Sequence, residues 1–133
     1  MNNIKIEIPL LARPKKNSQS IVYNPKTKKP MIVQSQRYKE FERNCGYFLK
    51  KYKMNINTPI NLKCEFTVPD LRKRDIVNLL NAMQDILVKY NVIEDDNYNI
   101  VSSVDGSRII YEKGVEKITI EISEVEDGIK RSS

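Results

Sequence analysis

The chain has 133 residues, of which 40% are hydrophobic and 30% charged, so it has the size and composition of one globular domain, not of a disordered or collagen-like chain. Its formal net charge of +6 favours a polyanionic partner such as nucleic acid. It contains no histidine, which excludes Ser-His-Asp and Cys-His nucleophile systems, a histidine general base and a His-ligated zinc site. Catalysis would therefore depend on carboxylates, lysine, tyrosine or a hard metal ion bound by oxygen.

The first part of the chain predicts a strand, a basic loop and a helix. Residues 4–10 alternate between apolar and polar side chains, the period of a half-buried strand, and Pro9 suggests its end. Residues 12–34 are rich in lysine and proline, and we interpret them as a long basic loop with room for one small hairpin. From Ser35, a suitable N-cap, to about Met54, apolar residues recur at three- and four-residue intervals. This spacing predicts an amphipathic helix.

The middle of the chain predicts a second strand and a second helix. Apolar and polar residues alternate from 60 to 68, and Pro69 and Asp70 end this strand. Asp75 is suited to cap the helix that follows, which runs to about Tyr90 with a single apolar stripe.

The last part predicts an acidic turn at residues 94–97, a hairpin and a closing strand. Asp105 and Gly106 stand between two apolar runs and tolerate positive φ, so they predict a hairpin with a type I′ turn. Residues 115–122 predict the closing strand, and residues 124–133 have the composition of a polar tail.

Together these elements indicate an α/β (α+β) fold, in which two main helices pack on a small mixed β-sheet in one domain over residues 1–123. The two cysteines, Cys45 and Cys64, are too few for a disulfide framework or a zinc site. No apolar run reaches the ~18 residues that a membrane span needs, and residues 1–5 lack the apolar core of a secretory signal. We therefore expect a soluble, cytosolic protein with no membrane partner.

Positive and negative residues are separated along the chain. Residues 1–74 contain 17 Lys and Arg against 5 Asp and Glu, a balance of +12, whereas residues 75–133 contain 6 against 12, a balance of −6. Any one basic cluster could be a solvated lysine-rich surface, but together they suit a phosphate backbone through counterion release. The basic clusters lie at residues 13–16, 26–29, 50–53 and 72–74.

The carboxylates of the second part are candidates for a metal site. Mg²⁺ needs only one or two protein carboxylates besides water and substrate phosphate, and it can generate hydroxide and stabilise a departing oxygen. Each candidate also has a structural interpretation: Asp75 as an N-cap, Asp95 and Asp96 as a solvated turn, and Asp105 as a turn residue. We interpret Asp85 as a solvent-facing helix charge. A helix of ~15 residues spans ~22 Å, so Asp75 and Asp96 would not meet if the segment were one straight rod.

One motif spans the start of the second helix and the acidic turn. Residues 68–80 read VPDLRKRDIVNLL, and Asp-Ile-Leu at 85–87 and Glu-Asp-Asp at 94–96 follow. This pattern resembles the RusA family of Holliday-junction resolvases over about residues 62–122, and residues 13–18 resemble that family's early loop. The resemblance implies a small α/β homodimer, common on phages and prophages, that binds four-way DNA junctions and nicks opposing strands with magnesium.

The resemblance also implies which side chains act. The acidic site would comprise Asp75, Asp96 and the adjacent Asp95, which would hold Mg²⁺ or Mn²⁺, and no small-molecule cofactor is implied. We expect the following residues to bind the DNA backbone: Arg72, Lys73, Arg74, Lys15, Lys16 and Asn17.

This chain departs from the family pattern at two positions. The family usually has Asp-x-Asp-Asn, whereas residues 75–78 read Asp-Ile-Val-Asn, so Val77 stands where a carboxylate ligand is expected. The lysine that the family places early in the helix falls on Asn81. Three acids could supply the missing ligand: Glu94, Asp95 and Asp105. We take Asp105 as the substitute, because its turn directly follows the site.

Three functions remain open. The first is a magnesium-dependent, structure-selective endodeoxyribonuclease that resolves four-way junctions in recombination and repair as a homodimer. The second is a non-catalytic or weakly catalytic junction-binding protein that kept the basic surface after losing the expected carboxylate. The third is a generic RNA-binding domain, although the seven Tyr and three Phe residues mostly occupy apolar stripes or loops and form no evident base-stacking platform.

Overall fold

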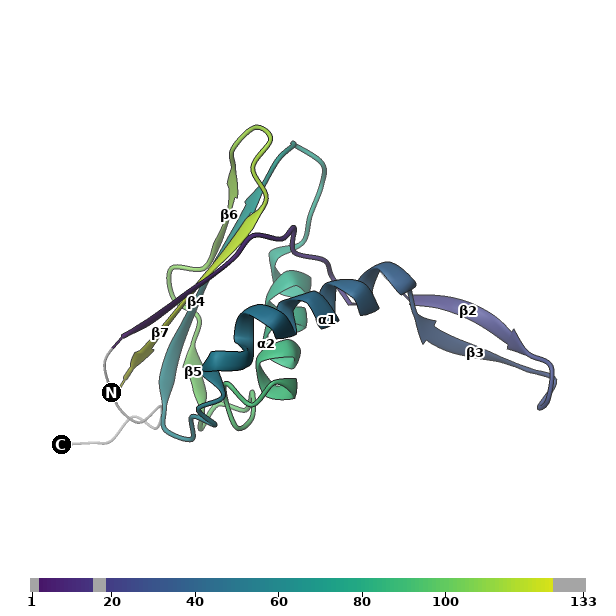
Figure 1. Ribbon diagram of the computed structural model, residues 1–133, viewed down its shortest axis with the longest axis horizontal. Coiled ribbons are helices and arrows are strands. Elements are labelled where there is room, and N and C mark those ends of the chain that lie inside the picture. Colours follow the sequence, from purple (N-terminus) through teal and green to yellow (C-terminus); the bar gives the residue numbers. More distant parts are fainter. Residues whose placement is uncertain (1–2, 16–18, 126–133) are drawn as a thin grey trace.

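Two helices pack on one face of a five-stranded β-sheet (Figure 1). The computed structural model describes residues 3–15 and 19–125. The strand order is β1-β7-β4, and both β5 and β6 pair with the outer side of β4, which confirms the α+β fold with a mixed sheet. The strands of this sheet are β1 (Ile4–Ile8), β4 (Ile60–Val68), β5 (Val101–Ser103), β6 (Arg108–Tyr111) and β7 (Lys117–Glu124).

Alternating apolar residues give the sheet one buried face. β7 lies antiparallel between β1 and β4, with Ile120 opposite Ile6 on one side and Cys64 on the other. These three side chains are at most 1% exposed. Lys63 and Glu65 alternate with the core residues along β4, so their side chains face the opposite side of the sheet. The strands predicted at 4–10, 60–68 and 115–122 are confirmed, with ends shifted by at most two residues.

Helix α1 (Gln36–Leu49) begins at the predicted N-cap, where Ser35 Oγ accepts a hydrogen bond from the Tyr38 N–H over 3.2 Å. It ends before the predicted Met54, and a short 3-10 helix, η2 (Lys50–Tyr52), follows. The early end has a tertiary cause. The N–H groups of residues 55 and 56 donate to carbonyl groups of residues 91 and 92, and a continued helix would carry them away from these partners.

Helix α2 (Ile76–Lys89) begins at Asp75, as predicted, because Asp75 Oδ1 accepts hydrogen bonds from two N–H groups of the first turn. The two helices approach closely at Gly46 of α1. A Cβ atom there would lie 2.6 Å from ring carbons of Tyr90, and the Tyr90 hydroxyl donates to the carbonyl of Glu42 over 3.0 Å. The contact between the helices therefore requires glycine at this position.

Replacing Gly46 with alanine is expected to lower the free energy of unfolding by about 1–3 kcal/mol, the usual range for overpacking, because the Tyr90 ring must move. At a position with free space the same change would stabilise a helix by roughly 0.5–1 kcal/mol. Urea unfolding of G46A, with N44A on the exposed side of α1 as the control, measures the difference. A G46A protein as stable as the wild type would show that the ring moves without cost.

The outer edge of the sheet consists of β5 and β6 in succession. Both strands run parallel to β4, with Val101 beside Ile60 and Arg108 beside Glu65. Consecutive strands that run in the same direction are not the two arms of a hairpin. The hairpin predicted around residues 105–106 is therefore wrong: these residues interrupt a single edge.

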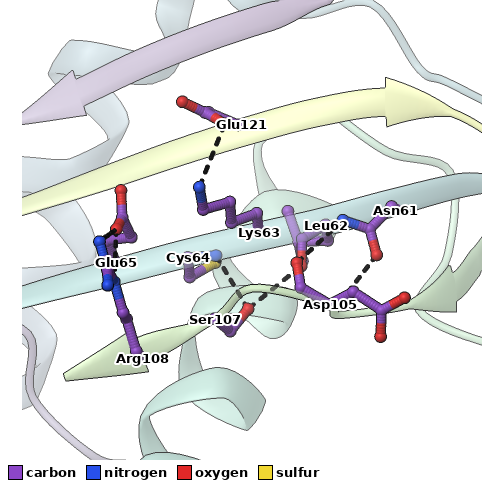
Figure 2. Close-up of polar contacts among 9 residues, drawn as sticks. All are labelled: Asn61, Leu62, Lys63, Cys64, Glu65, Asp105, Ser107, Arg108 and Glu121. Carbon is purple, nitrogen blue, oxygen red and sulfur yellow. Dashed lines mark hydrogen bonds and ion pairs between the residues drawn. The ribbon is translucent and has the colours of Figure 1, made fainter.

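The side chain of Asn61 on β4 explains this interruption (Figure 2). Its Oδ1 accepts a hydrogen bond from the Asp105 N–H over 2.8 Å, and its Nδ2 donates to the Asp105 carbonyl over 3.1 Å. The same Oδ1 also accepts a hydrogen bond from the Ser103 hydroxyl over 2.6 Å. Ser107 Oγ similarly accepts from the Cys64 N–H over 3.0 Å. These side chains take the place of backbone pairing where the edge leaves β4, so the chain returns in its original direction.

An ion pair joins Arg108 and Glu65 on this edge, with Nη2 2.7 Å from Oε2 (Figure 2). The hydrogen bond from Arg108 lowers the pKa of Glu65 in the folded state. The pair therefore stabilises the fold above the ordinary glutamate pKa of 4.5, and this contribution is lost as the pH falls through the folded-state pKa.

Replacing Arg108 with glutamine should lower the free energy of unfolding at neutral pH by at most about 1 kcal/mol, because the arginine side chain is 65% exposed. The difference from the wild type should disappear in acid, once Glu65 is protonated in both folded and unfolded states. Urea unfolding over a pH series measures it, and a difference that does not change with pH would contradict this account.

A separate two-stranded hairpin extends away from the sheet and helices (Figure 1). Its strands, β2 (Gln19–Asn24) and β3 (Lys29–Gln34), pair antiparallel, which confirms one small hairpin in the predicted basic loop. Most of the predicted tail, residues 126–133, lies outside the described residues, and Glu124 belongs to β7. In the described parts of the chain, no helix is long and apolar enough to cross a membrane.

Candidate active site

A surface cavity of about 410 Å³ beside the second half of α2 collects acidic side chains. Asp95 and Asp96 reach it from the segment after α2, and Asp85 reaches it from the helix itself. The cavity is lined by Lys15, Glu42, Asp85, Val88, Lys89, Asp95 and Asp96. Its four carboxylates outnumber its two ammonium groups, so the cavity has a net negative charge in a basic protein.

The acidic turn reaches this cavity because the chain reverses after α2. Asn91 adopts a φ of 60°, and the Val92 N–H donates to the carbonyl of Leu87 over 2.9 Å. Val92 itself is fully buried, so the reversal is fixed by packing as well as by hydrogen bonds. As a result, Asp96 returns alongside Asp85 instead of continuing beyond the end of the helix.

Asp96 has the most unfavourable environment for its negative charge. Burial raises its pKa, and so do its hydrogen bond to Asp95 and the negative charges of Asp95 and Asp85. The pKa of Asp95 is lowered instead, because the Asp96 N–H donates to its Oδ1 over 2.7 Å and the Asn97 side chain donates to its Oδ2 over 3.1 Å. A cation bound between Asp85 and Asp96 would offset their mutual repulsion. These oxygen donors therefore fit a hard divalent ion.

Basic groups also lie at the cavity. Lys15 Nζ is 3.6 Å from Asp85 Oδ2, and Lys89 forms an ion pair with Glu42. Lys15 is 44% exposed, so its ammonium group is accessible to a phosphate that enters the cavity. The cavity thus brings its carboxylates together with the Lys15 ammonium group, whose charge suits a phosphate.

Four acids were predicted for the site: Asp75, Asp95, Asp96 and Asp105. Within one chain, only Asp95 and Asp96 of these line the cavity. Asp75 caps α2 and lies ten residues before Asp85, about 15 Å along the helix axis. Asp105 is hydrogen-bonded to Asn61, whose position on β4 faces away from the helices. Among residues 3–15 and 19–125, no group of three or more His, Cys, Asp or Glu side chains is arranged to hold a metal ion. A metal would therefore depend on two carboxylates, with water and phosphate as its other ligands.

The predicted DNA-binding residues differ in their freedom to bind. Arg74 is only 15% exposed, and its guanidinium binds the Asp70 carboxylate at 3.0 Å and the carbonyls of Asp70 and Arg72. Arg72 is 83% exposed and is 3.8 Å from Asp70, and Lys73 is exposed. In the structure, Arg74 thus holds the connection between β4 and α2. Lys16 and Asn17 lie outside the described residues.

The two cysteines belong to the core. Burial raises the pKa of both Cys45 and Cys64 to about 12, so neither thiol ionises near neutral pH. Neither cysteine therefore supplies a thiolate nucleophile near neutral pH.

The comparison with known proteins settles the family. The protein-family model described as Endodeoxyribonuclease RusA matches residues 11–123. The chain belongs to the RusA family. This is a family of nucleases that act on Holliday junctions, and the match extends the resemblance upstream to include the whole β2–β3 hairpin. A search of curated proteins found no match.

Both departures from the RusA pattern lie on one exposed row of α2. Val77, Asn81, Asp85 and Lys89 follow one another at four-residue intervals, and all four are exposed. Val77 is 59% exposed, so its apolar side chain does not serve the core. The row leads from the N-terminus of α2 to the acidic cavity, and Asp85 is its only acid. Asp85 is exposed, as predicted for a solvent-facing helix charge, and the four-residue spacing is the sequence signal that places it on the row leading to the cavity.

Proposed function

We propose that this protein is a divalent-metal-dependent endodeoxyribonuclease that nicks four-way DNA junctions, with Mg²⁺ as the metal and Mn²⁺ as a substitute. The observation that carries the proposal is the convergence of Asp85, Asp95 and Asp96 on one cavity beside Lys15, in a chain of the RusA family. Nucleases without histidine can work in this way, because a hard metal ion supplies the activated water.

Each side chain of the cavity has a role in this proposal. Asp85 and Asp96 would hold the metal ion, and Asp95 would position Asp96 through the hydrogen bond from the Asp96 N–H. A bound Mg²⁺ would activate water and neutralise the scissile phosphate. Lys15 would move from Asp85 to a phosphate oxygen at the cavity rim. Outside the cavity, Arg72 and Lys73 would bind the backbone of the same DNA.

The other predicted residues take different roles within one chain. Asp75 would cap α2 and Asp105 would secure the sheet edge, so neither would ligate the metal within its own subunit. Lys16 and Asn17 remain proposed DNA contacts, because they follow Lys15 directly in the sequence.

We also propose that the protein acts as a homodimer. The described residues of one chain provide the single candidate site proposed here, whereas resolution of a junction requires two nicks on opposing strands. A two-fold dimer would present two equivalent sites to a substrate that is itself pseudo-symmetric, and such dimers are the commonest assembly. We also propose that the enzyme acts in the cytoplasm.

A synthetic four-way junction, end-labelled on each strand in turn, tests the function directly. The wild-type protein should nick opposing strands with Mg²⁺ or Mn²⁺, should not nick them with EDTA, and should leave a linear duplex of the same sequence intact. Absence of nicking with both metals, in protein that binds the junction, would reject the enzyme.

A second function is favoured by one observation: Val77 and Asn81 leave the exposed row of α2 without the carboxylate and lysine of the RusA pattern. With these groups absent, the protein could bind junctions and nick them weakly or not at all. A gel shift that is specific for the junction, without nicking, would establish this second function.

A further inference from the structure

The β2–β3 hairpin concentrates positive charge away from the candidate active site. Residues 19–34, which comprise the two strands and the turn between them, contain three Lys and no Asp or Glu. The hairpin therefore has a net charge of +3. Its tip contains Lys26, Lys28 and Lys29, and within the described residues none of the three forms an ion pair with a carboxylate.

The tip is an ordered turn that holds these lysines apart from the body. Asn24 Oδ1 accepts hydrogen bonds from the Lys26 N–H over 2.9 Å and from the Thr27 N–H over 3.4 Å, and the Lys28 N–H donates to the Asn24 carbonyl over 2.8 Å. Lys28 has a φ of 56°, a left-handed conformation that glycine or asparagine adopts more easily. Residues 25–30 are all exposed. A lysine at this position is therefore conformationally costly and contributes nothing to the core.

The hairpin is long enough to extend along a DNA duplex. A major groove about 12 Å wide admits a two-stranded β-ribbon. Each strand has six residues, so the tip lies about 20 Å from the base of the hairpin. Gln19, the first residue of β2, follows Lys15 of the acidic cavity by four residues and lies within about 14 Å of it. The hairpin therefore starts near the cavity and extends away from it.

From this arrangement we infer that the β2–β3 hairpin is a DNA-binding arm, which lies along a duplex arm of the branched substrate and contacts its phosphates through Lys26, Lys28 and Lys29. The inference rests on the proposed function, because it assumes that branched DNA occupies the cavity. The arm contributes affinity and orientation, and it takes no part in the chemical step. Its contacts are with phosphate groups and do not depend on the base sequence.

A triple variant, K26Q/K28Q/K29Q, tests the arm. Dissociation constants for a four-way junction are measured over a NaCl series in EDTA, and nicking is measured in Mg²⁺ at saturating protein. Each lost phosphate contact reduces the slope of log K against log[NaCl] by about 0.9, so the slope should fall by about 2–3. Affinity at low salt should fall on the order of 10²-fold. The nicking rate at saturation should stay within about twofold of the wild type.

The matched control is K50Q/K51Q/K53Q, which removes the same charge at η2, at the opposite end of α1 from the hairpin. Its slope should stay close to that of the wild type. The single variant K28G guards against misfolding: it removes one charge, relieves the left-handed lysine, and should lower the slope by about 0.9.

The outcomes separate the arm from the proposed function. A wild-type slope in the triple variant and in K28G would overturn the arm, and so would equal losses in the arm variant and the η2 control, which would indicate only a net-charge effect. Lost binding to single-stranded RNA with unchanged binding to the junction would also overturn it, in favour of an RNA partner. Failure of the wild-type protein to nick junctions would reject the enzyme, whereas the salt slopes would still test the arm.

Discussion

Replacing Asp96 with asparagine is expected to reduce junction nicking by at least ~10²-fold, because a metal ligand contributes several kcal/mol to stabilisation of the transition state. Binding of the junction in EDTA should be unchanged or tighter, since the variant removes a negative charge close to the phosphate. Stability at neutral pH should not fall: the raised pKa of Asp96 shows that its ionised form is disfavoured in the folded protein. Single-turnover nicking, gel shifts and thermal melts measure the three quantities.

The same assay distinguishes the acids. Asp85→Asn should lower nicking about as much as D96N, because both side chains would hold the metal in one cavity. Asp75→Asn is the matched control: asparagine caps a helix as well as aspartate does, so the fold should persist and nicking should change little. Full activity of D85N together with loss of activity in D75N would place the metal at the N-terminus of α2 and contradict the proposed site.

The double variant V77D/N81K is expected to raise the nicking rate by about tenfold or more. The gain is expected from N81K, because Asn81 lies one turn before Asp85, about 6 Å along the helix, so a lysine there reaches a phosphate at the cavity, and a well-placed acid or base is typically worth 10²–10⁴-fold. Val77 lies about 12 Å before Asp85, so V77D restores the acid of the RusA pattern without adding a ligand to the cavity. Val77 is exposed and lies in the first turn of α2, which contains no acid. A negative charge there should also stabilise the helix by about 0.3–1 kcal/mol.

V77N/N81Q is the control for this gain, because it makes the same positions polar without adding charge. Nicking by both variants is compared under single-turnover conditions, with thermal melts alongside. An unchanged rate in V77D/N81K would mean that the departures from the family pattern are not what limits cleavage in this chain.

Local patterns in the sequence predicted most of the fold. Alternation over residues 60–68 and the cap at Asp75 depend only on neighbouring residues, and both are confirmed. The turn at Asp105 and Gly106 failed as a hairpin signal because its partner, Asn61, lies 44 residues earlier in the chain. No local pattern in the sequence indicates that the side chain of Asn61 will hydrogen-bond the backbone of Asp105 and so hold the edge of the sheet to β4.

The candidate site shows the same division between local and distant information. Asp95 and Asp96 stood out in the sequence because they are adjacent, and they do lie at one cavity. Asp85 lies at the same cavity because of the reversal at Asn91 and the burial of Val92, which no local pattern in the sequence indicates. Asp75 does not line this cavity, in agreement with the length of the helix, but the length alone did not show that the segment after α2 returns along the helix.

The interrupted edge formed by β5 and β6 has a consequence for how the protein behaves at high concentration. A long, regular outer strand exposes a row of unpaired backbone groups that can recruit a strand from another molecule. Here β5 has three residues and β6 has four, with the segment held by Asn61 between them, and the opposite edge strand β1 stops at Ile8, just before Pro9. Neither edge of the five-stranded sheet therefore presents a long, regular row of backbone groups to which a strand of another molecule could pair.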